Sequence, residues 1–319
     1  MDILIDKEAD GKCIREFLLI NVGISTAMLK HLKFIDDGIL VGGKHVTVRH
    51  ILREGEILSI KTEDSEASEN IVPSDIEVDI AFEDGDAVVL DKPPYMPTHP
   101  SHGHFDDTLA NALCYRYRNE KNPFVFRPVN RLDRNTSGLV LVAKTRMAAA
   151  KLSLAMKNGM IRKEYVAVLD GILPCDEGVI DTYIKREKES IITRTVCTEG
   201  EGGDRAITKY KVVFCDGRHT VVFATPVTGR THQLRLHFAH LGAAIVGDDM
   251  YGKPSTCIGR HALHAIKLSF PHPRAGERIE LYSPLPADIK ELICHIFSAE
   301  DKEKVLSALD KNKEKNSNG

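Results

Sequence analysis

The sequence lacks the features that mark membrane-spanning, secreted and cysteine-ligated metal proteins. None of its apolar runs approaches the roughly 20 residues that a membrane-spanning helix needs, and residues 1–7 lack the basic start of a signal peptide. The seven cysteines are scattered and include no Cys-x-x-Cys pair. Such a set argues against a disulfide framework and against a zinc site, so we expect a cytoplasmic protein with reduced thiols.

A basic excess is also missing. The 43 lysines and arginines are outnumbered by 46 aspartates and glutamates, which gives a net charge of −3, whereas a dedicated binder of duplex nucleic acid usually carries a surplus of positive charge. Any contact with nucleic acid must therefore come from a local basic patch. Residues 63–71 hold an acidic, serine-containing run without apolar periodicity, which we interpret as a solvated linker.

The linker divides the chain into two predicted domains and a tail. Residues 1–62 combine two short apolar patterns of helical spacing with a Gly42-Gly43 hairpin signal and a closing strand. In residues 72–296, strand patterns occur without regular strand–helix alternation, which predicts an α+β fold with a mixed, mainly antiparallel sheet. Residues 297–319 alternate Lys with Glu and Asp, and we expect a charged surface helix there that frays into a disordered tail.

Residues 127–138 are the most informative part of the sequence. They place Arg131, Asp133 and Arg134 directly before the apolar run 139–143, which has the length and the branched residues of a buried strand. Asp133 is therefore expected on a short loop at the mouth of a rigid strand. A carboxylate in that position could act as a nucleophile or a base, although an ion pair that ties down the loop is the commoner use of an isolated Arg-Leu-Asp-Arg.

Two later segments carry further candidate residues. Residues 163–171 alternate as a strand and place Tyr165 on one of its faces, where a core tyrosine is the ordinary interpretation. Residues 225–237 predict a strand that ends at Thr228 and a helix that begins at Arg230. Arg230 would then lie at a helix N-terminus, where free backbone donors suit an anion or a carboxylate partner.

The histidines offer a competing interpretation. His232, His237 and His240 occur at spacings that can bring ring nitrogens together around a metal on a helix. However, no carboxylate stands at the helix position where a zinc hydrolase keeps its base, and Gly42-Gly43 and Gly202-Gly203 lack the companions of a phosphate-binding loop. We therefore predict neither a metal nor an organic cofactor.

The segment that contains Asp133 resembles the signature loop of the RluA-type pseudouridine synthases, which runs His-Arg-Leu-Asp, two variable residues, then Thr-Ser-Gly and an apolar strand. Asn130 stands where many members have the histidine. The segments around Tyr165 and Arg230 resemble the family's Lys-x-Tyr strand and its Thr-Gly-Arg-x-His-Gln-Leu-Arg block, in the family's order.

This resemblance implies a role for each candidate residue. Asp133 would be the catalytic nucleophile, Tyr165 would stack on the target base, and Arg230 would pair with Asp133. Arg131 would contact RNA, and Arg235 would contact RNA or be a structural contact. The fold implied is the pseudouridine synthase fold, and the enzymes of this family use neither a metal nor an organic cofactor.

The N-terminal residues 1–62 resemble the alpha-L motif, a small RNA-binding module first seen in a ribosomal small-subunit protein. Lys30, Lys33, Lys44 and Arg49 lie around the second predicted helix and the hairpin. A basic surface of this kind is by itself most often only solvated, but the resemblance implies that these side chains contact RNA.

The function implied is the isomerisation of a uridine in structured RNA, by a protein that we expect to be a monomer. The alpha-L module favours ribosomal RNA of the large subunit, and transfer RNA is the alternative substrate. Two rival functions are a non-catalytic RNA-binding assembly factor and a metal-dependent RNA hydrolase that uses the histidines. The presence of Asp133, Tyr165 and Arg230 argues against the first rival.

Overall fold

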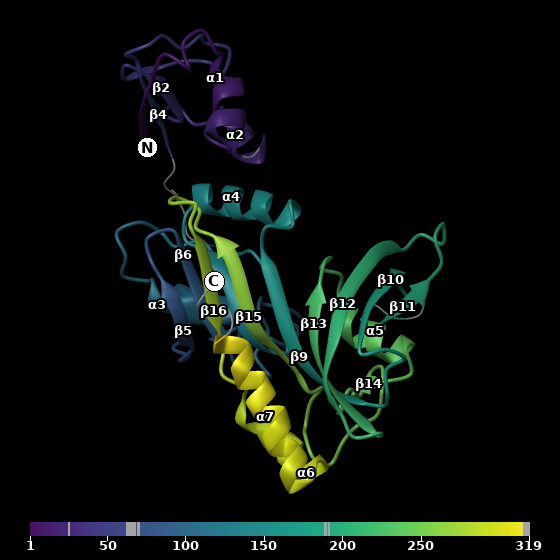
Figure 1. Cartoon of the computed structure of the whole chain (residues 1–319). Coiled ribbons are helices and arrows are strands. Elements are labelled where there is room, and N and C mark those ends of the chain that lie inside the picture. Colours follow the sequence, from purple (N-terminus) through teal and green to yellow (C-terminus); the bar gives the residue numbers. More distant parts are fainter. Residues whose placement is uncertain (25, 62–67, 69–70, 188–189, 191, 315–319) are drawn as a thin grey trace.

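The computed structural model describes residues 1–24, 26–61, 68, 71–187, 190 and 192–314. Most of the predicted linker, namely residues 63–67 and 69–70, lies outside this description. The described chain forms two units, each with its own sheet and its own apolar core (Figure 1). No helix among the described residues is long and apolar enough to cross a bilayer.

The N-terminal unit is a four-stranded antiparallel sheet covered by short helices. Its elements are β1 (Asp2–Leu4), α1 (Ile14–Glu16), the π-helical turn η1 (Phe17–Asn21), α2 (Thr26–Leu32), β2 (Ile39–Val41), β3 (Lys44–His45) and β4 (Ile57–Ile60). The strand order is β1-β4-β2-β3. The Gly42-Gly43 hairpin expected from the sequence joins β2 to β3, and both glycines have positive φ, as a tight hairpin turn requires.

The second unit is built on a twelve-stranded sheet. Its strands are β5 (Asp79–Glu83), β6 (Ala87–Lys92), β7 (Arg127–Pro128), β8 (Ser137–Ala143), β9 (Arg162–Asp170), β10 (Glu177–Arg186), β11 (Arg194–Cys197), β12 (Asp204–Cys215), β13 (His219–Pro226), β14 (Ala244–Ile245), β15 (Leu263–Pro271) and β16 (Arg278–Tyr282). The order along the sheet is β11-β10-β12-β13-β9-β15-β8-β6-β5, with β14 on β9, β16 on β15 and β7 on β8.

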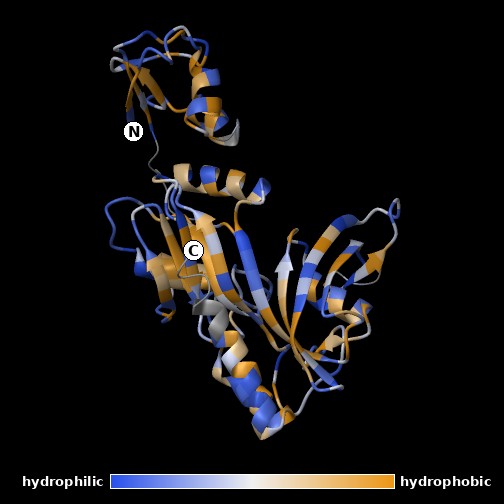
Figure 2. Cartoon of the chain, in the orientation of Figure 1, coloured by the Kyte–Doolittle hydropathy of each residue, from blue (hydrophilic) through white to orange (hydrophobic). Residues whose placement is uncertain are grey.

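The sheet is mixed and mainly antiparallel, because β8 and β15 are parallel and the other pairs run antiparallel. Its helices are α3 (Leu109–Arg116), α4 (Arg146–Lys157), α5 (Gln233–His240), α6 (Ala287–Ile296) and α7 (Ala299–Glu314). This arrangement confirms the predicted α+β class. In Figure 2, α4 shows hydrophilic and hydrophobic residues in turn, as expected of a helix that covers a sheet with one face.

Strand β8 is buried along its whole length, which confirms the strand predicted for residues 139–143. Val140 and Val142 belong to the main core, whereas Leu139 and Leu141 pack with α4 on the other face. Because both faces are covered, the loop that precedes β8 starts from a rigid position. The helix α4 also contacts the N-terminal unit, since Met147 packs against the core of that unit.

The C-terminal region differs from the expectation of a charged surface tail. Val305 and Leu309 of α7 are buried and belong to the main core, and Leu306 packs against it. Helix α7 therefore packs on the core of this unit, because these three residues give an otherwise charged helix one apolar stripe. The end of the expected disordered tail, residues 315–319, lies outside the described residues. Figure 1 shows α6 and α7 together at one end of the sheet.

The buried position of α7 predicts that Leu309→Ala lowers the free energy of unfolding by about 2–5 kcal/mol, since it removes a core side chain and leaves a cavity. Ser307→Ala is the matched control, because Ser307 is exposed on the same helix, and it should change stability by no more than about 0.5 kcal/mol. Urea unfolding of both variants measures the difference. Equal, small effects of the two substitutions would contradict the packing of α7.

Candidate active site

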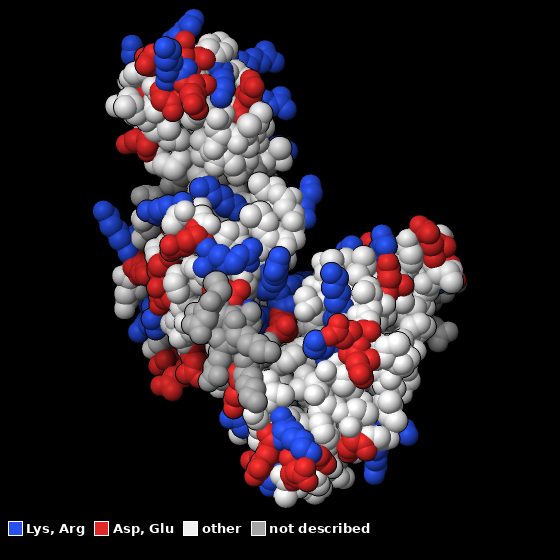
Figure 3. All heavy atoms as spheres, viewed as in Figure 1, with Lys and Arg blue, Asp and Glu red and all other residues white. Residues whose placement is uncertain are grey.

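The molecular surface is hollowed between the half of the sheet that carries β15 and the half that carries β12 and β13 (Figure 3). Asp133 lies on the loop between β7 and β8, and its side chain is 29% exposed. The loop turns back at once, since the Thr136 amide donates to the Asp133 carbonyl at 3.1 Å. The carboxylate is thus accessible to a substrate, but its backbone is fixed.

The residues that follow Asp133 are held by the segment that leads into β15. The buried guanidinium of Arg260 donates to the Asn135 carbonyl at 3.0 Å and to the Ser137 hydroxyl at 3.2 Å. Its Nε and Nη2 atoms also donate to Asp288 of α6, at 2.7 and 2.9 Å. Helix α6 therefore stabilises the Asp133 loop through one buried arginine.

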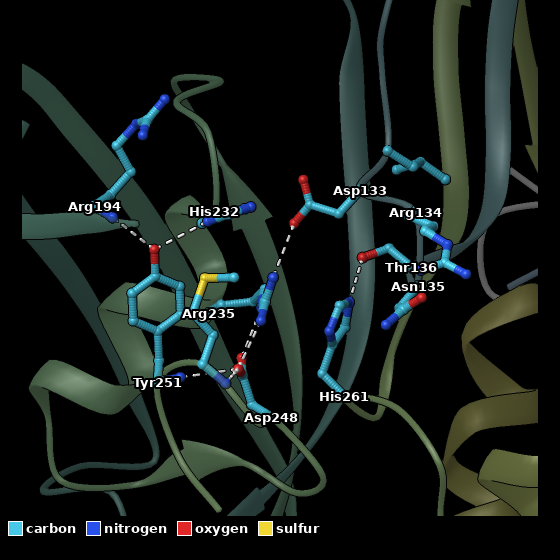
Figure 4. Close-up of polar contacts among 12 residues, drawn as sticks. Asp133, Arg134, Asn135, Thr136, Arg194, His232, Arg235, Asp248, Tyr251 and His261 are labelled. Atoms are coloured by element: carbon cyan, nitrogen blue, oxygen red, sulfur yellow. Dashed lines mark hydrogen bonds and ion pairs between the residues drawn. The ribbon is translucent and has the colours of Figure 1, made fainter. Parts of the chain in front are cut away.

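Two further contacts hold the residues that follow Asp133. The Thr136 hydroxyl and the His261 Nε2 atom lie 2.8 Å apart (Figure 4). Burial, and next the positive charge of Arg235, lower the pKa of His261 to about 3, so the ring is neutral at physiological pH. Gly138 has a φ of 111°, and an added Cβ there would overlap the backbone of Ala265. Glycine at this position lets β8 approach β15 closely.

The two residues adjacent to Asp133, Leu132 and Arg134, are held by the segment that follows β6 and by its last residue, Lys92. The Thr98 hydroxyl donates to the Leu132 carbonyl at 2.9 Å. The ammonium of Lys92 is fully buried and donates to the carbonyls of Pro93, Met96 and Arg134 at 2.8, 2.8 and 3.1 Å. Burial lowers the pKa of Lys92 to about 7, an effect that the nearby charge of Asp133 opposes.

The cationic partner of Asp133 is Arg235 of α5. Its Nη1 atom lies 3.8 Å from Asp133 Oδ2, and its Nε and Nη2 atoms form a bidentate pair with Asp248 at 2.7 Å each (Figure 4). Asp248 is fully buried and also accepts from the amides of Met250 and Tyr251 at 3.0 Å. Burial alone would raise the pKa of Asp248, but its bonds to Arg235 lower it below the usual value.

The predicted pairing of Arg230 with Asp133 was wrong. Arg230 points toward β12, where its Nη1 lies 3.5 Å from Asp204 Oδ2 and its Nε donates to the Arg205 carbonyl at 3.2 Å. Of the two roles expected for Arg235, contact with RNA or a structural contact, the geometry favours the structural one, because the side chain is only 6% exposed and has three carboxylate neighbours.

The error has a local cause, because α5 begins at Gln233 and not at Arg230. His232 precedes the helix in a left-handed conformation with φ 58°. The Gln233 side chain accepts from the Thr228 hydroxyl at 2.7 Å and from the Arg230 amide at 3.0 Å, which closes the loop on itself. This turn directs Arg230 away from Asp133 and leaves Arg235 on the face toward it.

Tyr165 lies in β9 and is 7% exposed. Burial raises the pKa of its hydroxyl, and the negative charge of Asp133 raises it further, so the structure brings Tyr165 into the electrostatic range of Asp133. On the opposite wall, the Tyr251 hydroxyl lies 2.9 Å from His232 Nδ1 and accepts from the Arg194 amide at 2.9 Å (Figure 4).

Asn130 has a structural role in the loop that contains Asp133. It is 7% exposed, its Nδ2 donates to the Leu139 carbonyl at 3.2 Å, and its Oδ1 accepts from the Leu141 amide at 2.8 Å. These bonds join the start of the Asp133 loop to β8. Asn130 therefore fixes the position of the loop by binding the backbone of β8.

The predicted RNA contacts lie on the surface. Arg131 is exposed beside Asp133, and the four basic residues Lys30, Lys33, Lys44 and Arg49 are exposed on the N-terminal unit. Figure 3 shows lysine and arginine side chains over α4 and along the upper part of the hollow. The contact of these residues with RNA stays a prediction.

Two histidines of the competing hydrolase hypothesis, His237 and His232, contact hydroxyl groups of the protein. His237 is buried, and its two ring nitrogens lie 2.9 and 3.0 Å from the hydroxyls of Thr208 and Thr182. His232 contacts Tyr251. Within the described part of the chain, no three His, Cys, Asp or Glu side chains are grouped so that they could hold a metal ion.

The sequence patterns did not predict the contacts that Arg260, His261, Asp248 and Tyr251 make at the site. The buried arginine and histidine follow no motif that local periodicity would single out. In each case the signal is a contact between distant segments, which only the fold supplies.

Comparisons with known proteins identify the family of this chain. A family model described as RNA pseudouridylate synthase matches residues 86–240. The Bacillus subtilis protein YjbO, named an uncharacterized RNA pseudouridine synthase, is 39% identical over 272 residues, which cover 85% of this chain and 95% of that protein. Ribosomal large subunit pseudouridine synthase D of Pseudomonas aeruginosa is 35% identical over 275 residues, which cover 82% and 84% of the two chains.

Solved structures show the same likeness. Human RNA pseudouridylate synthase domain containing 1 is 28% identical with a TM-score of 0.52, over 65% of this chain and 83% of that chain. The human domain containing 4 is 22% identical with a TM-score of 0.57, over 68% and 92%, and it supports the fold assignment. From these relatives, the chain belongs to the RNA pseudouridine synthase family, whose members isomerise uridine in RNA.

Proposed function

We propose that Asp133 is the nucleophile of this pseudouridine synthase and that its substrate is a uridine in the RNA of the large ribosomal subunit. The observation that carries the first part is the position of Asp133, which is exposed in the hollow and faces the buried Arg235–Asp248 pair. The exposed basic residues of the N-terminal unit and the name of the Pseudomonas relative support the second part.

The reaction needs an ionised carboxylate that can reach the sugar. The bond between uracil N1 and ribose C1′ must break, the ring must turn, and C5 must bond to C1′. Asp133 would add to C1′ or assist the loss of the 2′ proton, and either route divides one difficult step into easier ones. Tyr165 would stack on the target base after that base has left its place in the RNA.

Arg235 is placed to attract Asp133 without forming a hydrogen bond to it. The bidentate bonds to Asp248 at 2.7 Å occupy Nε and Nη2, so Nη1 is the group directed at Asp133. Its distance of 3.8 Å exceeds that of a hydrogen bond. The positive charge therefore attracts the Asp133 carboxylate and directs it, while the lone pairs of the carboxylate stay free for the sugar.

Asp133→Asn should abolish isomerisation, because the amide keeps the shape of the side chain but loses the nucleophile. Release of tritium from RNA that contains 5-tritiated uridine measures the reaction, and a gel-shift titration should show RNA affinity close to that of the unchanged protein. Appreciable turnover by the variant would show that Asp133 is not the nucleophile.

Arg235→Lys and Arg230→Lys form a matched pair that separates the two arginines. Lysine cannot reproduce the bidentate fork toward Asp248, so Arg235→Lys should lower kcat by about a hundredfold or more, the usual scale for loss of a preorganised charge. Arg230→Lys should keep kcat within about threefold, because Arg230 contacts only Asp204 and a backbone carbonyl. The reverse order of effects would restore Arg230 as the partner of Asp133.

The RNA assignment is tested by mapping pseudouridine in total RNA from a strain that lacks this gene and from its parent. The proposal predicts that one or more sites in large-subunit ribosomal RNA lose the modification and regain it when the gene is returned, but not when the Asp133→Asn variant is returned. Loss confined to transfer RNA would identify the alternative substrate. An unchanged map together with defective ribosome assembly would favour a non-catalytic assembly factor.

A further inference from the structure

The described chain contains two non-glycine residues with positive φ, and both lie at the active site. One is His232, which precedes the helix that carries Arg235. The other is Tyr95, with φ 66° and 48% of its surface exposed. A bulky residue seldom adopts this conformation, and such outliers gather at functional sites.

Tyr95 lies on a loop that is bonded to both neighbours of Asp133. On one side, the Thr98 hydroxyl donates to the Leu132 carbonyl and accepts from the Leu132 amide, at 2.9 and 3.3 Å. On the other side, Lys92 donates to the Arg134 carbonyl at 3.1 Å, and Arg134 Nε donates to the Tyr95 carbonyl at 3.3 Å. The position of Tyr95 is therefore set relative to Asp133.

The loop is also rigid. Pro93 and Pro94 precede Tyr95 and Pro97 follows it, and each proline fixes its own φ. The adjacent Met96 is buried in the main core. An aromatic ring held out of a rigid loop loses little conformational entropy when a ligand covers it.

The hydroxyl end of the Tyr95 side chain packs against the protein near Gly259. A Cβ added to Gly259 would lie 2.9 Å from the Tyr95 hydroxyl, so the hydroxyl lies against the segment that leads to Arg260 and His261. Nearly half of the residue stays open to solvent. The apolar surface of Tyr95 thus remains exposed beside the catalytic loop, although the neighbouring Met96 is buried.

We propose that Tyr95 is a stacking platform for an RNA base that flanks the target uridine. Single-stranded RNA presents unstacked bases, and proteins bind them on exposed aromatic rings. When the target uridine leaves its stack to reach Asp133, its neighbours lose a stacking partner, and Tyr95 replaces that partner. The strained backbone persists because it directs the ring outward. The inference rests on the pseudouridine synthase activity and deepens it by naming a second base-binding position.

The test compares Tyr95→Gly and Tyr95→Phe in the full chain. Glycine adopts the observed φ without a Cβ, so Tyr95→Gly should leave the melting temperature unchanged or slightly raised. The same variant should raise KM for RNA about tenfold, the size of one lost base–aromatic stack, with kcat changed much less. Tyr95→Phe keeps the ring and should behave like the unchanged protein.

The substrate is a 5-tritiated transcript around whichever uridine the mapping identifies, so an error in the proposed RNA class does not affect this test. The control is Ile172→Ala, which removes an exposed apolar side chain beyond the far end of β9 and should leave KM unchanged. Transcripts with an abasic sugar at each flanking position locate the base, since at one position Tyr95→Gly should cause no further rise in KM.

Three results would overturn the proposal. An unchanged KM in Tyr95→Gly would show that the ring contacts no base. A lower melting temperature with a matching loss of kcat would show that Tyr95 supports only the fold. A rise in KM that is equal in Tyr95→Phe and Tyr95→Gly would show that the hydroxyl, and not the ring, binds RNA.

Discussion

The active site depends on one buried charge, the guanidinium of Arg235. A buried arginine is costly unless carboxylates surround it, and removal of one member of such a pair leaves an uncompensated charge. Asp248, fully buried, supplies two bonds at 2.7 Å, and Asp133 and Asp249 supply two further negative neighbours, each at 3.8 Å. Because α5 carries Arg235 and the loop before β8 carries Asp133, this one cation joins the two halves of the sheet across the hollow.

The rest of the site keeps Asp133 within reach of that cation. Arg260 and His261 hold the residues after it, and Lys92 and Thr98 hold the residues on either side of it. These four contacts come from segments far apart in the sequence. The loop therefore keeps its shape while the carboxylate stays partly exposed, which is the preorganisation that the proposed nucleophilic step requires.

The sequence predicted what local patterns determine. The apolar run 139–143 indicated a buried strand, and its position placed Asp133 at the strand's mouth, as the structure has it. The choice between Arg230 and Arg235 was not available from the pattern, because both are arginines of one short block. It depends on the left-handed turn at His232, which shifts the start of the helix by three residues.

Helix α7 illustrates the same limit. Its charge pattern suggested solvent on all sides, and the three apolar residues that cover the core were too few to outweigh the charged ones in the sequence. The conformation of Tyr95 was even harder to predict from the sequence. Nothing in the order of residues 93–97 reveals a positive φ at a tyrosine, and the bonds that join this loop to Leu132 and Arg134 come from a distant part of the sequence.

The most direct test of the account is a crystal structure of the full chain bound to RNA whose target uridine is replaced by 5-fluorouridine. The account predicts the target sugar in the hollow, with C1′ about 3–3.5 Å from the Asp133 carboxylate or bonded to it. Arg235 should remain between Asp133 and Asp248. A target sugar distant from Asp133, or Arg230 in place of Arg235, would contradict it.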